Sequence, residues 1–169
     1  SDVYKRQHFN LGLCYFNSKD NKMAAHHLRK AIEIDATHSS AFLLYAYALN
    51  DLDQWVQSFY AFHFFLLLEP NTERSKDAFS EMLDILNAKL EPGSVRLTPE
   101  DGIDREWLYK NIQLKKPQGT DSASEYSYFV EASKLIFFTI AQMQNDSQSG
   151  LLWFFFVPTY DCLLYTSDA

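Results

Sequence analysis

The feature that most constrains this sequence is an arrangement of large and small residues that occurs twice, thirty-four residues apart. The first copy has Leu-Gly at positions 11–12, and the second has Tyr-Ala at positions 45–46. Such a period indicates an array of like units, each of which buries its apolar face against a neighbour. The other matched pairs are Tyr15 and Leu49, Ala24 and Ser58, Leu28 and Phe62, Ala31 and Phe65, and Ala36 and Pro70.

Within each copy, apolar residues recur at helical spacing in two runs, and a short polar turn separates the runs. This spacing predicts a pair of helices in each copy and one further helix after the second copy. The predicted helices are 8–17, 22–34, 39–50, 54–68 and 72–90. The predicted N-caps are Asp20 or Asn21 for helix 22–34, Ser39 or Ser40 for helix 39–50, and Asn71 or Thr72 for helix 72–90. The fourth helix is apolar on more than one stripe, so we expect it to be buried on more than one side.

A thirty-four-residue unit built as helix–turn–helix resembles the tetratricopeptide repeat (TPR), and the resemblance covers residues 8–90. In that family, small residues at the positions of Gly12 and Ala46 let the two helices of a pair approach closely. Phe65 departs from the pattern in size, and Ala36 stands where the family has its closing proline. The resemblance implies an all-α array of antiparallel helix pairs, made of repeats 8–38 and 39–72 and a closing helix 73–90.

After the array, the sequence predicts a different organisation, in which we identify no family. Residues 91–122 are expected to form a loop, a short helix at 104–114 and a linker, because Pro and Gly interrupt this stretch. Ser122 followed by Glu125 is a capping box. It opens a helical C-terminal segment that we place at residues 123–160.

Both ends of the chain, residues 1–7 and 161–169, resemble translated sequencing-adapter sequence from metagenomic assemblies. We expect both to be non-native and leave them out of the fold prediction, as one leaves out a cloning scar. The alternative is that both are native termini. If they are foreign, the natural protein extends beyond both ends, and the sequence then assigns no cellular compartment.

Composition and motifs argue against several classes of function. The formal net charge of −7, without a stripe of Lys and Arg, argues against a nucleic-acid partner. No apolar stretch reaches the length of a membrane-spanning helix. The sequence has no glycine-rich phosphate loop and no Gly-x-Ser-x-Gly elbow. We therefore expect neither enzymatic activity nor a cofactor.

Three groups of residues could suggest a metal site or a reactive thiol, and each has a simpler interpretation. His26 and His27 are adjacent, so they point about 100° apart on a helix and are expected to be solvated surface residues. The acids at 100–104 lack the spacing of a calcium loop and suit the first turn of a helix. Cys14 is expected to be a small buried apolar residue. We predict no metal site.

The resemblance places the candidate binding site on the inner face of the array, which the first helix of each repeat lines in the TPR family. The residues at these positions are Phe9, Leu13, Phe16, Asn17, Leu43, Tyr47, Asn50 and Asp51. This set is largely apolar and aromatic, with two asparagines, which suits an extended or helical peptide. One TPR subclass clamps the terminal carboxylate of a peptide with Lys, Arg and Asn residues, and this sequence lacks that basic set.

The implied function is a scaffold that binds a protein or peptide partner. Two other functions stay open: an accessory domain of a longer enzyme or envelope protein, and a structural or assembly subunit. The candidate binding residues are also open to being covered by a missing repeat or by the C-terminal segment. The coding sequence on either side of this chain would separate these interpretations.

The incomplete array predicts self-association through exposed apolar ends. Arrays of fewer than about three repeats are marginal alone, and seven consecutive apolar residues, Leu151–Val157, precede the second adapter-like string. We expect residues 8–160 to expose an apolar patch larger than a few hundred Å². The purified fragment should then associate in sedimentation experiments and bind a hydrophobic dye. A stable monomer without dye binding would contradict this prediction.

Overall fold

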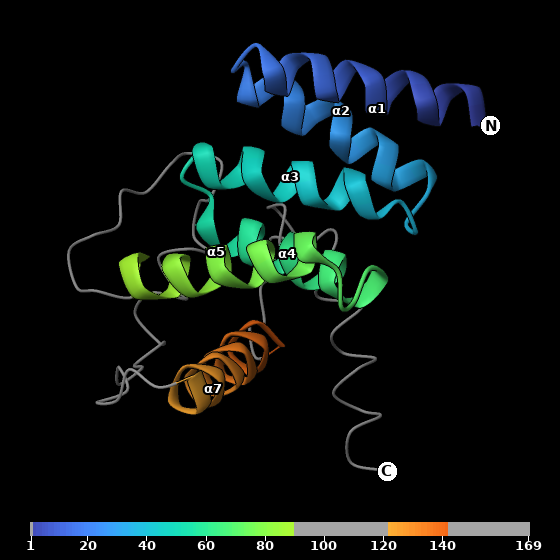
Figure 1. The fold of residues 1–169 in the computed structure, drawn as a ribbon. Helices are drawn as coiled ribbons and strands as arrows, with labels where there is room; N and C mark the ends of the chain where they lie inside the picture. The colour runs from blue at the N-terminus through green and yellow to red at the C-terminus, as the bar shows by residue number, and fades with distance from the viewer. Residues whose placement is uncertain (1, 90–121, 142–169) are drawn as a thin grey trace. The chain divides into compact units, whose positions relative to one another are not determined.

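The computed structural model describes residues 2–89 and 122–141, and in these ranges it consists of six α-helices without any strand (Figure 1). The helices are α1 (Asp2–Asn17), α2 (Asn21–Ile34), α3 (Ser39–Asp51), α4 (Trp55–Leu68), α5 (Glu73–Lys89) and α7 (Ser122–Ala141). From α1 to α4, consecutive helices pack against each other as antiparallel neighbours, and α1 also touches α3. The predicted all-α array of helix pairs is confirmed. The chain divides into two compact units, Ser1–Met82 and Leu83–Ala169, and each is described by itself.

The backbone repeats with the same thirty-four-residue period as the sequence. α2 begins at Asn21 and α4 at Trp55, and each is 14 residues long. The turn before each of these helices contains one residue with a φ of 63°, Lys19 in the first turn and Asp53 in the second. Equivalent backbone hydrogen bonds close the two turns: Asp20 N donates to Tyr15 O at 3.0 Å, and Gln54 N donates to Leu49 O at 2.9 Å. The two helix pairs therefore share one backbone plan.

The helix boundaries agree with the predicted ones to within a few residues, except at the start of α1. This helix begins at Asp2 rather than at residue 8. Residues 2–7 therefore continue the helix, although the adapter-like resemblance sets residues 1–7 aside. Their non-native origin stays a prediction, because a helical conformation does not reveal where a sequence comes from.

Small residues bring the two helices of each pair close together, as the period predicts. A Cβ added to the buried Gly12 would lie 2.6 Å from Leu28 Cγ and 3.2 Å from Leu28 N, so α2 leaves no room for a side chain. In the second pair, the Ser58 hydroxyl donates a hydrogen bond to the Ala46 carbonyl oxygen at 2.7 Å. Gly12 and Ala46 thus each face the second helix of their own pair.

A carboxylate after the second helix of each pair holds the start of the first helix. Asp35 accepts a hydrogen bond from Lys5 Nζ at 2.9 Å, and Glu69 accepts one from Ser39 Oγ at 3.0 Å. The two contacts lie thirty-four residues apart at both partners, and we call them the repeat clasps. Asp35 also accepts hydrogen bonds from the hydroxyl and backbone N–H of Thr37, at 2.6 and 2.9 Å. The Thr37 hydroxyl, followed by Lys5, holds the pKa of the Asp35 carboxyl well below its usual range.

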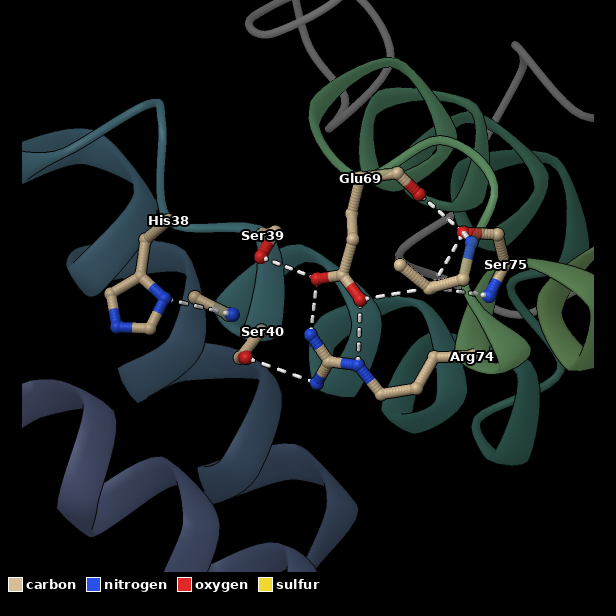
Figure 2. A network of polar contacts seen from close by, with 8 residues as sticks. His38, Ser39, Ser40, Glu69, Arg74 and Ser75 are labelled. Atoms are coloured by element: carbon tan, nitrogen blue, oxygen red, sulfur yellow. Dashed lines mark hydrogen bonds and ion pairs between the residues drawn. The ribbon is translucent and has the colours of Figure 1, made fainter.

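The second repeat clasp extends into α5, as Figure 2 shows. Arg74 forms an ion pair with Glu69, in which Nε lies 2.9 Å from Oε1, and its Nη1 donates to Ser40 Oγ at 3.1 Å. The Ser75 hydroxyl donates to the Glu69 carbonyl oxygen. The Arg74 guanidinium, followed by the Ser39 hydroxyl, lowers the pKa of Glu69 to about 2. Glu69 therefore connects the end of α4 to the starts of both α3 and α5.

The predicted N-caps of two helices are confirmed. Asp20 accepts a hydrogen bond from Met23 N at 3.2 Å at the start of α2. Thr72 Oγ1 accepts one from Ser75 N at 3.1 Å at the start of α5. Both side chains satisfy a backbone N–H group that has no partner within its own helix.

At α3 the predicted cap is wrong. The cap is His38, whose Nδ1 accepts a hydrogen bond from Ala41 N at 3.2 Å, rather than Ser39 or Ser40. The Ser39 hydroxyl donates to Glu69 instead, and the Ser40 hydroxyl accepts from the guanidinium next to that carboxylate. Because contacts with neighbouring helices take up both hydroxyls, the residue before them caps the helix.

Helix α4 is buried on more than one side, as its composition predicts. All residues from 54 to 62 are buried, and Trp55, Phe59 and Phe62 are at most 1% exposed. His63 follows this run and packs edge-on against Phe59, with ring centroids 4.8 Å apart. Burial lowers the pKa of His63 to about 3. The imidazole is therefore neutral at physiological pH.

The free side of α1 exposes Leu11, whose counterpart in the second pair is buried. Leu11 is 43% exposed, whereas Tyr45, at the equivalent position of α3, is 3% exposed. Helix α2 packs against both α1 and α3, so α3 has a neighbour on the side where α1 presents Leu11. Val3 and Tyr4 are also more than 60% exposed. Self-association through this apolar surface stays a prediction.

The predicted C-terminal helical segment begins with a helix, α7. Among the residues of α7 whose burial the structure describes, the buried apolar ones are Tyr128, Phe129, Ala132 and Ile136. The predicted loop, short helix and linker within 91–121 lie outside the described residues. So do the acidic residues at 100–104 and all predictions for 142–169, including the apolar run at 151–157 and the adapter-like end.

Replacing Gly12 by Ala should destabilise the first helix pair, although Ala is the better helix former by about 1 kcal/mol. The new Cβ would lie 2.6 Å from Leu28 Cγ, and overpacking of a closed contact costs about 1–3 kcal/mol. Because overpacking exceeds the gain in helix propensity, the thermal midpoint should fall. Asn10→Ala, at an exposed position of the same helix, is the control and should not lower it. A Gly12→Ala variant more stable than the wild type would contradict the close approach.

His63 should make the folded state sensitive to acid. Its pKa is about 3 when folded and returns to about 6.5 on unfolding, so between these values the unfolded chain binds the additional proton. The free energy of unfolding should therefore decrease as the pH falls below about 6.5. Urea unfolding at pH 6.5 and pH 5 should show a decrease about 1–2 kcal/mol larger for wild type than for His63→Phe. Equal decreases in the two proteins would contradict this assignment.

Candidate protein-binding face

The eight predicted binding residues lie on the first helix of each pair, four on α1 and four on α3. The two helices touch and run in the same direction, so equivalent positions are presented by neighbouring helices. The equivalent pairs are Phe9 and Leu43, Leu13 and Tyr47, Phe16 and Asn50, and Asn17 and Asp51. Asn17 and Asp51 are exposed, and the other six residues are half-buried. We call the surface of these eight residues the inner face.

The α1 part of the inner face is apolar except for Asn17, and its aromatic rings lie near the turns between helices. The Phe9 ring centroid is 4.4 Å from the ring centroid of His38, the N-cap of α3. Lys19, in the turn after α1, places its Nζ 5.6 Å from the Phe16 ring centroid. Leu13 lies between the two phenylalanines along the helix and is half-buried. These side chains keep exposed surface, so a partner can contact them without rearranging the helix pair.

The α3 part of the inner face combines an aromatic ring with polar groups. Tyr47 packs edge-on against the buried Phe62, with ring centroids 5.1 Å apart. Asn50 Nδ2 donates a hydrogen bond to Glu81 Oε1 of α5 at 3.0 Å. Burial raises the pKa of Tyr47, and the Glu81 and Asp77 carboxylates raise it further. Tyr47 therefore packs on the core, and its hydroxyl lies in the electrostatic field of the Glu81 and Asp77 carboxylates.

Asp51 is held by a bond to the neighbouring helix. Its Oδ2 accepts a hydrogen bond from Nδ2 of Asn21, the first residue of α2, at 3.1 Å. This bond ties the end of α3 to the start of α2. Asp51 thus has a role in the packing of successive units in addition to its place on the inner face.

The predicted set omits two acidic residues of α5 that border the inner face. Asp77 and Glu81 follow Leu43 and Tyr47 by thirty-four residues, so they hold the same positions on the next first helix. Glu81 contacts α3 through Asn50, and Asp77 lies one turn earlier on the same side of α5. The period that identified the other positions also identifies these two.

His8 and His27 meet between α1 and α2, and the exposed His26 lies beside His27. His8 Nδ1 and His27 Nδ1 are 3.0 Å apart, and the His27 ring stacks on Tyr15 with centroids 5.5 Å apart. Burial lowers the pKa of His27, and the neighbouring His26 and His8 lower it further. His26 is exposed as expected, but the prediction that His27 is solvated is wrong, because α1 covers part of it. Cys14, predicted to be buried, is exposed.

In the described ranges, no group of three or more His, Cys, Asp or Glu side chains is arranged so that it could hold a metal ion. Within the same ranges, no helix combines the length and apolar character needed to cross a bilayer.

No protein-family model, no curated protein and no solved structure matches this chain. Two features of the chain itself bear on function: the period shared by sequence and backbone, and the chemistry of the inner face.

Proposed function

We propose that this chain is a helical-repeat scaffold of the TPR kind, which binds a protein or peptide segment on its inner face and catalyses no reaction. The observation that carries the proposal is the thirty-four-residue period, which recurs in the sequence, the turns and the repeat clasps. An array with one repeating plan presents one continuous surface from successive first helices. Such surfaces serve as extended binding sites in repeat proteins.

The burial pattern supports a binding role for the inner face. Residues that repeat on the packing side are fully buried, as Leu28 and Phe62 are. The apolar residues of the inner face are only half-buried. Aromatic rings held on helices offer large contact area and lose little conformational entropy when a partner binds. Phe9, Phe16 and Tyr47 are therefore the proposed anchors for apolar side chains of a partner segment.

Peptides selected from a random display library on the purified full chain provide ligands without knowledge of the natural partner. Leu13→Asp places a charge between Phe9 and Phe16 and should weaken the selected peptides about tenfold or more. Because Leu13 is half-buried, the charge should also lower the thermal midpoint, so binding is compared at a temperature at which melts show the variant folded. Leu67→Asp is the matched control, since Leu67 is 70% exposed on α4 and outside the inner face.

Two results would contradict the proposed function. One is a selection that enriches no peptide. The other is a set of peptides that bind the folded Leu13→Asp variant as tightly as the wild type.

A further inference from the structure

We infer that His8 and His27 form a proton-sensitive latch: one shared proton holds α1 against α2, and a second proton opens this contact. We call the two residues the histidine latch. Opening it would withdraw Phe9, Leu13 and Phe16 of α1 from a bound partner, and in this respect the inference rests on the proposed function. The latch itself depends only on the contact between α1 and α2.

The Nδ1 atoms of the two imidazole rings face each other. They are 3.0 Å apart, and the ring planes enclose 30° with centroids 5.2 Å apart. The centroid distance exceeds the nitrogen–nitrogen distance by about two ring radii, so the two nitrogens point almost directly at each other. A proton fits between them, whereas a metal ion needs about 2 Å to each nitrogen and does not fit on this line.

Hydrogen-bond chemistry fixes how many protons this contact holds. A neutral imidazole has one N–H donor and one acceptor nitrogen, and a charged imidazolium has two donors. With one proton between the Nδ1 atoms, one ring donates and the other accepts. Charging the donor ring strengthens this bond, because the bond is then charge-assisted. When both rings are charged, two N–H donors face each other and two positive charges repel, so the contact opens.

The groups that act on His27 come from both helices of the pair. On α1, His8 and Tyr15 contact its ring, and Tyr15 stacks on it with centroids 5.5 Å apart. Burial lowers the pKa of His27, and the neighbouring His26 and His8 lower it further. Helix α3, which packs against α2 and touches α1, places His38 against Phe9.

Other charged groups of this unit have partners of their own. These groups are Lys5 with Asp2 and Asp35, Arg29 and Lys30 with Glu33, Asp20 with the Met23 N–H, and Asp51 with Asn21. The first repeat clasp stays charged in mild acid, because the Thr37 hydroxyl and Lys5 hold the pKa of Asp35 well below its usual range. Mild acid therefore weakens the contact of α1 with α2 at the histidine latch and leaves this clasp in place.

Linkage gives the direction of the pH effect. With α1 detached, each histidine binds a proton with a pKa of about 6.5, whereas the closed latch accepts one proton and resists the second. The open state therefore binds more protons as the pH falls below about 6.5, and opening becomes more favourable. The two protonation steps belong to the pair rather than to either residue.

Hydrogen exchange of the full chain, followed at the amides of α1, measures this opening. After correction for the intrinsic exchange rate, protection of α1 should fall about tenfold or more between about pH 7.5 and pH 5, and protection of α3 and α4 should fall less. His8→Asn places a neutral amide near the position of Nδ1, where it can donate to His27 without taking up a charge. This variant should keep its α1 protection at pH 5. Equal protection of wild-type α1 at both pH values overturns the inference.

Two matched variants each remove one histidine outside the latch. His26→Asn changes the exposed neighbour of His27, and His38→Asn keeps a side chain that can cap α3. Both should show the wild-type loss of α1 protection at pH 5. A loss abolished by either of them assigns the response to that histidine and overturns the latch.

An NMR titration of the wild-type imidazoles needs no variant to fold. His8 and His27 should titrate in two linked steps, with the second step displaced to lower pH. Independent titration of the two rings, each in a single step, overturns the shared proton.

Peptides selected on the full chain from a random library test the consequence for the inner face. They should bind the wild type about tenfold more weakly at pH 5 than at pH 7.5, and His8→Asn about equally at both. Peptides that lose affinity on Leu13→Asp but bind the wild type equally at both pH values overturn the regulatory role and leave the proposed function standing. A selection without any enriched peptide overturns the proposed function and the regulatory role, while the exchange experiment still decides whether the latch opens.

Discussion

The close approach of the two helices in each pair is the constraint on which the rest of the structure depends. Gly12 lies so near Leu28 that α2 leaves no space for a Cβ, and the Ser58 hydroxyl reaches the backbone of α3 at Ala46. A larger residue at either position would force the paired helices apart. The carboxylate after each second helix would then move away from the start of the first helix, which it holds. The small residues and the repeat clasps are thus parts of one arrangement.

The second repeat clasp connects the second helix pair to the next helix, α5. Because Glu69 bonds to Ser39 and Arg74 at once, and Arg74 also bonds to Ser40, the starts of α3 and α5 are held relative to each other. Farther along the same helices, Asn50 meets Glu81. The position of the polar border of the inner face therefore depends on the second repeat clasp, which lies two to three helical turns away along the same helices. The proposed binding face and the packing of the helix pairs therefore depend on the same register between first helices.

Much of the fold could be predicted from the sequence because the period and the helical spacing agree. The repeat clasps could not be predicted, since Lys5 falls in the adapter-like string and Ser39 is a typical helix cap. Its hydroxyl serves a neighbouring helix instead, and His38 takes over the capping role. Such competition between local and tertiary partners for one side chain is invisible in sequence. The partial burial of His27 also depends on a tertiary contact, its packing against His8 of α1, which the sequence does not reveal.

In the candidate site, too, the sequence predicts some features and tertiary contacts determine the others. The register of Leu13 and Tyr47 follows from the period alone, and the same period places Asp77 and Glu81 on α5, but it does not show which neighbours these two side chains meet. Only the bond from Asn50 shows that Glu81 faces α3. Tyr47 joins the two parts of the face, since its ring rests on Phe62 of the core while its hydroxyl lies in the field of the carboxylates. A change at Tyr47 would therefore affect both the packing on the core and the polar part of the face, whereas a change at Leu13 affects the apolar part alone.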